Sequence, residues 1–231
     1  PRPEALDEVV LGERGLLKGA TNGDIFIDTS TNSPAVLRRI ASVCKEKGIF
    51  VLDSPLTGGI SGATAGTLTM MVGGHKDAFE NSLPILRCVG KTIVHMGDVG
   101  SGNICKFVNN MLGQINIHGI AEAMAFAAKA GLDLHKVFAV LETGHVANRI
   151  LTELYGEHGF KGDFEPGFTI DLAFKDQILI AEAGREMGVP LYFNGLGIQK
   201  LLDARARGLG NKDITAAIIP LEDLLGIKIR I

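Results

Sequence analysis

Hydrophobic residues in the first hundred positions form short, mostly continuous runs separated by segments with helical spacing. The runs lack a clean alternation of apolar and polar positions, which is typical of strands covered on both faces of a sheet. The expected strands are residues 24–30, 49–55, 67–74 and 91–97. A helix and its exit are expected over residues 4–18, and further helical segments over 32–48 and 76–90, with Ser33 as N-cap of the second and residues 57–66 as a loop. Alternating strands and helices predict a doubly wound, parallel or mixed α/β sheet.

The pattern changes near residue 101, where strand signals stop. One long helix over 103–131 is followed by five further helical segments. These are residues 135–143, 147–155, 169–187, 193–207 and 213–225. We therefore expect two domains, an incomplete dinucleotide-binding α/β domain over 1–101 and an all-helical domain over 102–231, joined by the long helix.

The α/β part lacks the glycine fingerprint G-x-G-x-x-G that binds a dinucleotide in the first strand–helix turn. The nearest candidate, Gly100-Ser-Gly102-Asn-Ile-Cys105, has no third glycine and opens the long helix, so we reject it. The chain also begins at Pro1 in the middle of a pattern. We expect it to be part of a longer protein whose preceding segment holds the fingerprint.

Composition narrows the functional classes. The 231 residues carry a net charge of −3 without a basic run, so nucleic acid is not an expected partner. No apolar run approaches the roughly 18 residues of a membrane span. Cys44, Cys88 and Cys105 form no CxxC pair, and the six histidines lack ligand spacing, so we expect a reducing compartment, no disulfide framework and no metal site.

The segment "GSGNICKFVNNMLGQ" places Lys106 near a helix start, where the macrodipole disfavours a cation. Lys106, Asn110 and Gln114 make a narrow polar stripe on a largely apolar helix. A solvated surface lysine is the ordinary interpretation of Lys106. The alternative is a lysine with a lowered pKa that donates a proton to a developing alkoxide, with Asn110 holding lysine or substrate.

Three other stretches carry candidate chemistry. Thr57-Gly58-Gly59 directly follows a strand, where backbone N–H groups and a hydroxyl can hold a carboxylate, although a flexible connection would look similar. "IDTSTNSP" contains Thr31, and on the sequence alone a plain helix start explains it better than a functional role does. Asp171 and Lys175 lie four residues apart, as in an ordinary surface ion pair.

Together these stretches resemble the β-hydroxyacid dehydrogenases, which include 3-hydroxyisobutyrate dehydrogenase, tartronate semialdehyde reductase and 2-(hydroxymethyl)glutarate dehydrogenase. "DSPLTGGISGATAGTLT" is similar to their substrate loop, "GSGNICKFVNN" to their catalytic segment, "DTSTNSP" to their cofactor motif and "FTIDLAFKDQ" to a further element. The four motifs stand in the family's order, and the resemblance runs from Pro1 almost to the C-terminus.

The resemblance implies a partial Rossmann-type sheet with a helical domain, and it assigns roles by position. Lys106 is then the general acid/base, and Asn110 binds substrate and orients the lysine. The substrate loop is Thr57, Gly58 and Gly59, with threonine in place of the usual serine, and the cofactor contacts are Pro1, Thr31 and Lys175.

The implied reaction is hydride transfer between NAD or NADP and a small β-hydroxy acid or its semialdehyde. The implied assembly is a homodimer or homotetramer built through the helical domain. We expect a cytoplasmic protein, or one of the mitochondrial matrix in a eukaryote.

Two other functions stay open on the sequence alone. One is a non-catalytic helical assembly and substrate-binding module, because the dinucleotide fingerprint is absent. The other is an imine reductase of related fold, which ranks lower because a lysine proton donor and a Gly-Gly carboxylate loop suit hydroxy acids. The residues that precede Pro1 in the gene would discriminate the module from the enzyme.

Overall fold

The computed structural model describes residues 3–231, so the predicted contact Pro1 lies outside the described residues. The contacts within the chain define two units, which divide between Asn109 and Asn110. This division falls inside one continuous helix, α5 (Ser101–Lys129). The boundary expected near residue 101 corresponds to the first residue of that helix.

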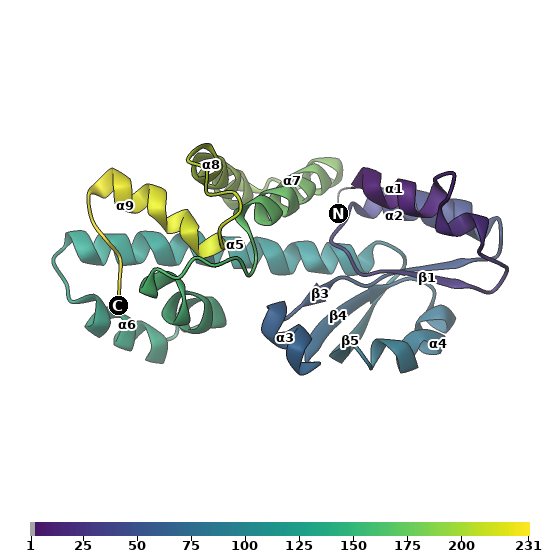
Figure 1. The fold of residues 1–231 in the computed structure, drawn as a ribbon, viewed down its shortest axis with the longest axis horizontal. Helices are drawn as coiled ribbons and strands as arrows, with labels where there is room; N and C mark the ends of the chain where they lie inside the picture. Colours follow the sequence, from purple (N-terminus) through teal and green to yellow (C-terminus); the bar gives the residue numbers. More distant parts are fainter. Residues whose placement is uncertain (1–2) are drawn as a thin grey trace. The chain divides into compact units, whose positions relative to one another are not determined.

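The first unit contains a mixed sheet (Figure 1). Its strands are β1 (Ile25–Asp28), β2 (Phe50–Asp53), β3 (Leu56–Thr57), β4 (Leu68–Gly73) and β5 (Gly90–Gly97). β1 pairs with β2 in parallel, and β4 runs antiparallel to β2 and β3 but parallel to β5. The predicted α/β architecture with a parallel or mixed sheet is therefore confirmed.

Helices cover both faces of this sheet. They are α1 (Pro3–Leu11), α2 (Pro34–Lys45), α3 (Gly59–Ala65) and α4 (Lys76–Leu86), with a 3-10 turn at Leu16–Lys18. Val51 packs with the residues of α1 and α2, whereas the adjacent Leu52 packs with those of β4 and α4. Because successive strand residues point to opposite faces, α2 and α4 lie on opposite sides of the sheet, as Figure 1 also shows.

The structure corrects two local predictions in this unit. Residues 57–66 are not a loop, because β3 ends at Thr57 and α3 follows directly. The glycine-rich sequence forms a short, mostly exposed helix whose N-cap and C-cap, Gly58 and Gly66, are glycines with positive φ. Ser33 occupies the N-cap position of α2 as expected, but its side chain makes no capping hydrogen bond.

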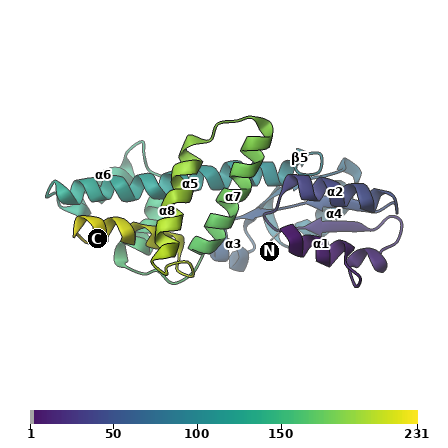
Figure 2. The same cartoon turned by 90° about the horizontal axis from the view of Figure 1, so that it is seen from above.

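The second unit is helical, as predicted. After the rest of α5 its regular helices are α6 (Leu134–Thr143), α7 (Ile170–Met187), α8 (Tyr192–Ala206) and α9 (Ile219–Leu225). Figure 2 shows α7 and α8 side by side, and the two helices pack closely. Met124, Tyr155 and Phe160 are among its fully buried core side chains, and the Tyr155 hydroxyl donates to the Ile117 carbonyl at 3.1 Å.

The irregular parts of the second unit differ from expectation. The helix expected over 147–155 begins at Ile150 and has π-type hydrogen bonding through Tyr155. The helix expected over 213–225 is divided into a 3-10 segment, Ile214–Ile218, and α9, with Pro220 near the junction. Apolar spacing located these segments, but it does not distinguish helix types with different hydrogen-bond registers.

Candidate active site

Lys106 lies on the first two turns of α5 and is half-buried. Its Nζ donates a hydrogen bond to the Leu56 carbonyl at 2.6 Å. Leu56 immediately precedes Thr57, so the lysine is held beside the predicted substrate loop within the first unit. A fully solvated lysine would make no such contact.

The start of α5 is fixed by a carboxylate that the sequence reasoning did not single out. Asp53, at the end of β2, is 0% exposed and accepts from the backbone N–H groups of Gly100 at 2.6 Å and Asn103 at 2.7 Å. A negative charge at this helix end satisfies N–H groups that have no helical partner and opposes the positive end of the dipole. Asp53 therefore explains how α5 can carry Lys106 so close to its start.

Gly102 belongs to this junction and not to a nucleotide fingerprint. A Cβ at this position would collide with the carbonyl oxygens of Met71 and Asp53. The glycine is required because the helix start approaches the backbone of β2 and β4. The structure thus supports the rejection of the Gly100–Cys105 segment as a dinucleotide motif.

The Thr31 loop is joined to the same helix. Asn103 Oδ1 accepts from the Asn32 backbone N–H at 2.8 Å, and Asn32 is fully buried. Asp28 shapes the preceding turn by accepting from the Ser30 N–H at 3.0 Å and the Ser30 hydroxyl at 2.7 Å. Burial raises the pKa of Asp28, and the Ser30 hydrogen bonds partly oppose this. The half-buried Thr31 therefore sits between two anchored residues.

The backbone at Gly58 and Gly59 has the conformation that makes glycine necessary. Their φ angles are +131° and +64°, which L side chains rarely adopt. A Cβ on Gly58 would lie 3.0 Å from Leu68 Cδ2, whereas the space beside Gly59 is open. Successive glycines with positive φ can turn neighbouring N–H groups toward an anion. This geometry agrees with the predicted carboxylate loop, whose ligand remains a prediction.

In the second unit a buried carboxylate connects two of the predicted residues. Asn110 Nδ2 donates to Asp176 Oδ2 at 2.6 Å, and Lys175 Nζ pairs with Asp176 Oδ1 at 3.0 Å. The expected Asp171–Lys175 pair is not formed, because Asp171 pairs with Arg205 of α8 at 2.6 Å. Sequence spacing missed Asp176, although the Lys-Asp dipeptide places it in the same motif.

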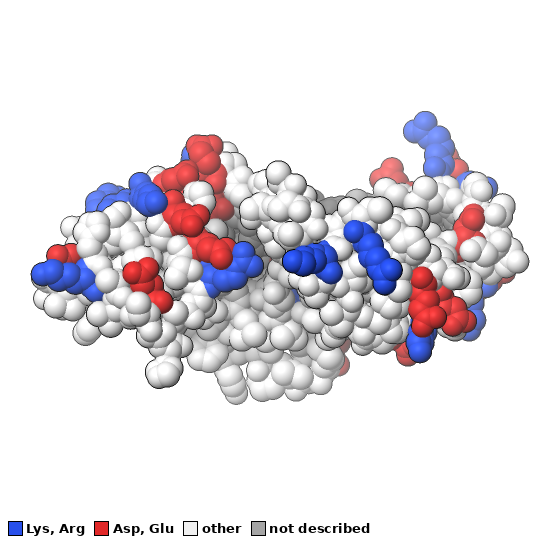
Figure 3. All heavy atoms as spheres, turned by 90° about the horizontal axis from the view of Figure 1, so that it is seen from below, with Lys and Arg blue, Asp and Glu red and all other residues white. Residues whose placement is uncertain are grey.

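Among residues 3–231 no group of three or more His, Cys, Asp or Glu side chains could hold a metal ion. Within the same residues no helix is both long and apolar enough to cross a membrane. The three cysteines are unpaired. Basic and acidic side chains are interspersed on the face in Figure 3.

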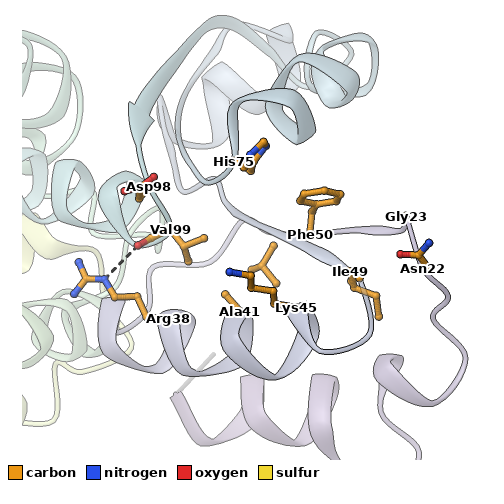
Figure 4. A pocket seen from close by; sticks show the side chains of 12 residues that line it. Asn22, Gly23, Arg38, Ala41, Lys45, Ile49, Phe50, His75, Asp98 and Val99 are labelled. Carbon is orange, nitrogen blue, oxygen red and sulfur yellow. Dashed lines mark hydrogen bonds between the residues drawn. The ribbon is translucent and has the colours of Figure 1, made fainter.

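A cavity of about 900 Å³ lies in the first unit (Figure 4). Its walls include Arg38 and Lys45 of α2, Phe50 at the start of β2, and His75. None of the predicted site residues lines it. The candidate site lies instead at the other end of β2, where Asp53 meets α5.

The described residues fit a dinucleotide at the carboxyl ends of β1 and β2. Nucleotides bind outside the carboxyl ends of parallel strands in open α/β sheets. Two buried polar atoms just beyond these ends, Asn32 Nδ2 and Ser54 Oγ, have no hydrogen-bond partner among the described residues. Buried polar atoms without a protein partner at both strand ends suit a binding site, because a polar group of the ligand can form the missing hydrogen bonds.

Comparison with known proteins agrees with this geometry. Residues 100–221 match the family described as NAD-binding of NADP-dependent 3-hydroxyisobutyrate dehydrogenase. Residues 1–97 match the NAD binding domain of 6-phosphogluconate dehydrogenase. The chain is 36% identical over 229 residues to 2-(hydroxymethyl)glutarate dehydrogenase of Eubacterium barkeri, covering 99% of this chain and 76% of the relative. This chain belongs to the β-hydroxyacid dehydrogenase family.

The dehydrogenase is also 35% identical to 2-hydroxy-3-oxopropionate reductase of Escherichia coli, over 97% of this chain and 76% of that protein. The crystal structure of 3-hydroxyisobutyrate dehydrogenase from Salmonella typhimurium matches with a TM-score of 0.83 and 27% identity, over 95% of this chain and 76% of that one.

These comparisons confirm the predicted family, the Rossmann-like α/β domain followed by a helical domain, and NAD or NADP as cofactor. The protein is an NAD(P)-dependent oxidoreductase of the hydroxyacid dehydrogenase type. An imine reductase from Bacillus cereus matches with a TM-score of 0.50 and 13% identity, which reflects the common fold alone. The dehydrogenase interpretation is therefore supported over the non-catalytic module and the imine reductase.

Proposed function

We propose that this dehydrogenase interconverts a small β-hydroxy acid and its semialdehyde, with Lys106 as the general acid/base. The observation that carries the proposal is the 2.6 Å hydrogen bond from Lys106 Nζ to the Leu56 carbonyl. It supports a proton donor beside a loop whose backbone suits a carboxylate. A substrate that carries a carboxylate near a carbonyl needs both a proton donor for the carbonyl oxygen and a loop that binds the carboxylate.

Some of the site residues bind the substrate, and others transfer the proton. N–H groups at Gly58 and Gly59, with the Thr57 hydroxyl, hold the substrate carboxylate. In the reduction, the Lys106 ammonium donates a proton to the oxygen that gains negative charge, and in the oxidation the neutral amine removes the hydroxyl proton. Asn110, oriented by Asp176, binds substrate and orients the lysine. The bound nicotinamide supplies or accepts the hydride.

Thr31 and Lys175 contribute to cofactor binding. The role of Thr31 is supported by the anchored turn between Asp28 and Asn32. The role of Lys175 is supported by its ion pair with Asp176. Pro1 is proposed as a further contact from its position in the family motif alone.

The helical unit is the proposed assembly surface of a homodimer or homotetramer. Tyr192, Phe193 and Leu196 on α8 are 79%, 67% and 62% exposed. An apolar group of this kind on one helix is typical of a protein–protein contact. Sedimentation of the intact protein at micromolar concentration is expected to show a dimer or tetramer, and Tyr192→Lys with Leu196→Lys is expected to shift it toward monomer. A wild-type monomer would contradict the proposal.

We propose a cytoplasmic location, supported by three unpaired cysteines in the described chain. Relatives of this dehydrogenase in Dictyostelium discoideum and mouse are named mitochondrial. Localisation of a tagged intact protein tests the assignment: the cytoplasm, or the mitochondrial matrix in a eukaryote, is expected, and secretion would contradict it.

The decisive experiment for function is a substrate panel with the intact protein. β-Hydroxy acids and semialdehydes of different chain length are assayed with NAD(H) and NADP(H) by nicotinamide absorbance. We expect turnover of at least one β-hydroxy acid, and little turnover of the matching neutral alcohol. Turnover of cyclic imines with none of hydroxy acids would overturn the proposal.

A further inference from the structure

Polar residues on one face of α5 continue beyond Asn110 through the second unit. Gln114, His118 and Glu122 follow at intervals of four residues, so they share one helix face with Asn110. Gln114 and His118 are buried, whereas Glu122 is exposed and pairs with Lys200 of α8 at 2.7 Å. The stripe therefore runs from the Asn110–Asp176 hydrogen bond to an ion pair at the protein surface.

Two further buried amides lie on α7 and α8. Gln177, next to Asp176, is fully buried, and Asn194 Nδ2 donates to the Gln177 carbonyl at 3.1 Å. One turn after Asn194, Gly197 lies against the His118 ring, since a Cβ there would be 3.7–3.8 Å from the imidazole. These contacts bring polar residues of three helices into one region.

Five polar atoms in this region have no hydrogen-bond partner among the described residues. They are Gln114 Oε1, His118 Nε2, Gln177 Oε1, Gln177 Nε2 and Asn194 Oδ1. A buried polar group without a partner destabilises the folded state, so folded proteins rarely tolerate several together. Internal water commonly satisfies such groups, because it donates and accepts at the same site. The four side chains are amides and an imidazole, which suit a neutral ligand of this kind.

We propose that Gln114, His118, Gln177 and Asn194 bind a chain of ordered water molecules that carries protons between the Asn110–Asp176 pair and the surface at Glu122–Lys200. The proton-carrying role rests on the function proposed for Lys106, whereas the binding of water does not.

His118 is suited to this position in its neutral form. Burial and, to a smaller extent, the Lys200 charge lower its pKa to about 4, against the opposing effect of the Glu122 charge. A neutral imidazole has one N–H and one lone pair, so it can pass a proton between two waters and return to its starting charge.

The reaction consumes or releases one proton in each turnover, and the water chain supplies or removes that proton. Each carbonyl reduction takes one proton from the Lys106 ammonium and leaves a neutral amine, one turn of α5 before Asn110. One proton from bulk water enters at the surface end, each water passes one on, and the last water of the chain gives one to the amine, which recovers its charge. Oxidation reverses the direction, and no species in the chain changes its net charge.

The kinetic test compares His118→Phe and Gln114→Leu with His135→Phe, a change at an exposed position of α6, in the intact protein. The two stripe variants are expected to lower kcat about tenfold, less than the roughly 10²–10⁴-fold worth of a general acid or base. KM should stay unchanged, the solvent deuterium isotope effect on kcat should rise, and small imidazole buffers should restore part of the rate. An unchanged isotope effect without buffer rescue would overturn the proton path.

Water binding is tested separately by nuclear magnetic resonance. Magnetisation transfer from long-lived water to the side-chain amide protons of Gln114, Gln177 and Asn194 is expected in the wild-type protein. Its absence would overturn the water chain even if the enzyme is active. Its presence in a protein that turns over no hydroxy acid would retain the water site and refute the function proposed for Lys106.

Discussion

Asp53 and Asn103 join the end of a strand to the first turn of the helix that carries Lys106. The Asp53 carboxylate accepts from both the backbone N–H and the side-chain amide of Asn103, at 2.7 and 3.2 Å. Asn103 in turn accepts from Asn32, beside Thr31. One buried polar network therefore fixes the lysine helix to the loop of the cofactor motif within the first unit.

Asp53→Asn tests this network. The variant places an NH₂ group among N–H donors and removes the charge opposite the helix start, so we expect the free energy of unfolding to fall by about 2–4 kcal/mol. Urea denaturation of the intact protein measures the change, with Asp98→Asn, an exposed residue before the same helix, as the control. A loss below about 0.5 kcal/mol, as at ordinary surface positions, would contradict the assigned role.

Lys106→Ala is expected to lower kcat by about two to four orders of magnitude, the usual worth of general acid–base catalysis. KM should change much less, because the carboxylate contacts stay in place. The exposed Lys91→Ala in the same unit serves as the control. A variant that keeps more than about a tenth of the wild-type kcat would show that the lysine only packs against the loop.

Much of the fold was predictable because apolar spacing records which positions are buried. The strands and the long helices follow this spacing, and α3 was missed because its seven residues, Gly59–Ala65, bury little beyond Gly62. The division inside α5 left no signal either, since helical spacing continues unbroken through Asn109 and Asn110.

The candidate site was predictable in its motif residues but not in its supporting contacts. Asp53 meets Gly100 and Asn103 across about fifty positions of sequence, a separation that local patterns do not encode. Asp171 was paired with the wrong partner for a related reason. The four-residue spacing suggested an ion pair between Asp171 and Lys175, but Asp171 pairs with Arg205 on the neighbouring helix α8.

Gly58→Val separates substrate binding from chemistry. The φ of +131° and the 3.0 Å approach to Leu68 Cδ2 make a branched side chain strained and obstructive in the loop. We expect a raised KM for hydroxy acids, since carboxylate contacts persist from ground state to transition state. A neutral analogue should be a poor wild-type substrate and lose little further.

Gly66→Val is the matched control for backbone strain. Gly66 ends α3 with a φ of +64°, and the space around its Cβ position is open. Equal losses for acid and neutral analogue in Gly58→Val would indicate general damage to the fold. An unchanged KM for the acid would remove the loop from the site.

His118 is expected to make stability depend on pH in the acidic range. Burial, together with the Lys200 charge, lowers its pKa from 6.5 to about 4, so between these values the unfolded chain binds a proton that the folded chain excludes. Stability due to His118 is therefore complete above pH 7 and decreases as the pH falls toward 4, by about 1.4 kcal/mol per pH unit midway. Urea denaturation between pH 7 and 5 should show a shallower dependence in His118→Gln than in the wild type, and none of this difference in the exposed His135→Gln. Parallel pH dependences in the wild type and His118→Gln would mean that His118 is protonated equally in the folded and unfolded chains, and so is not the buried neutral imidazole of the structure.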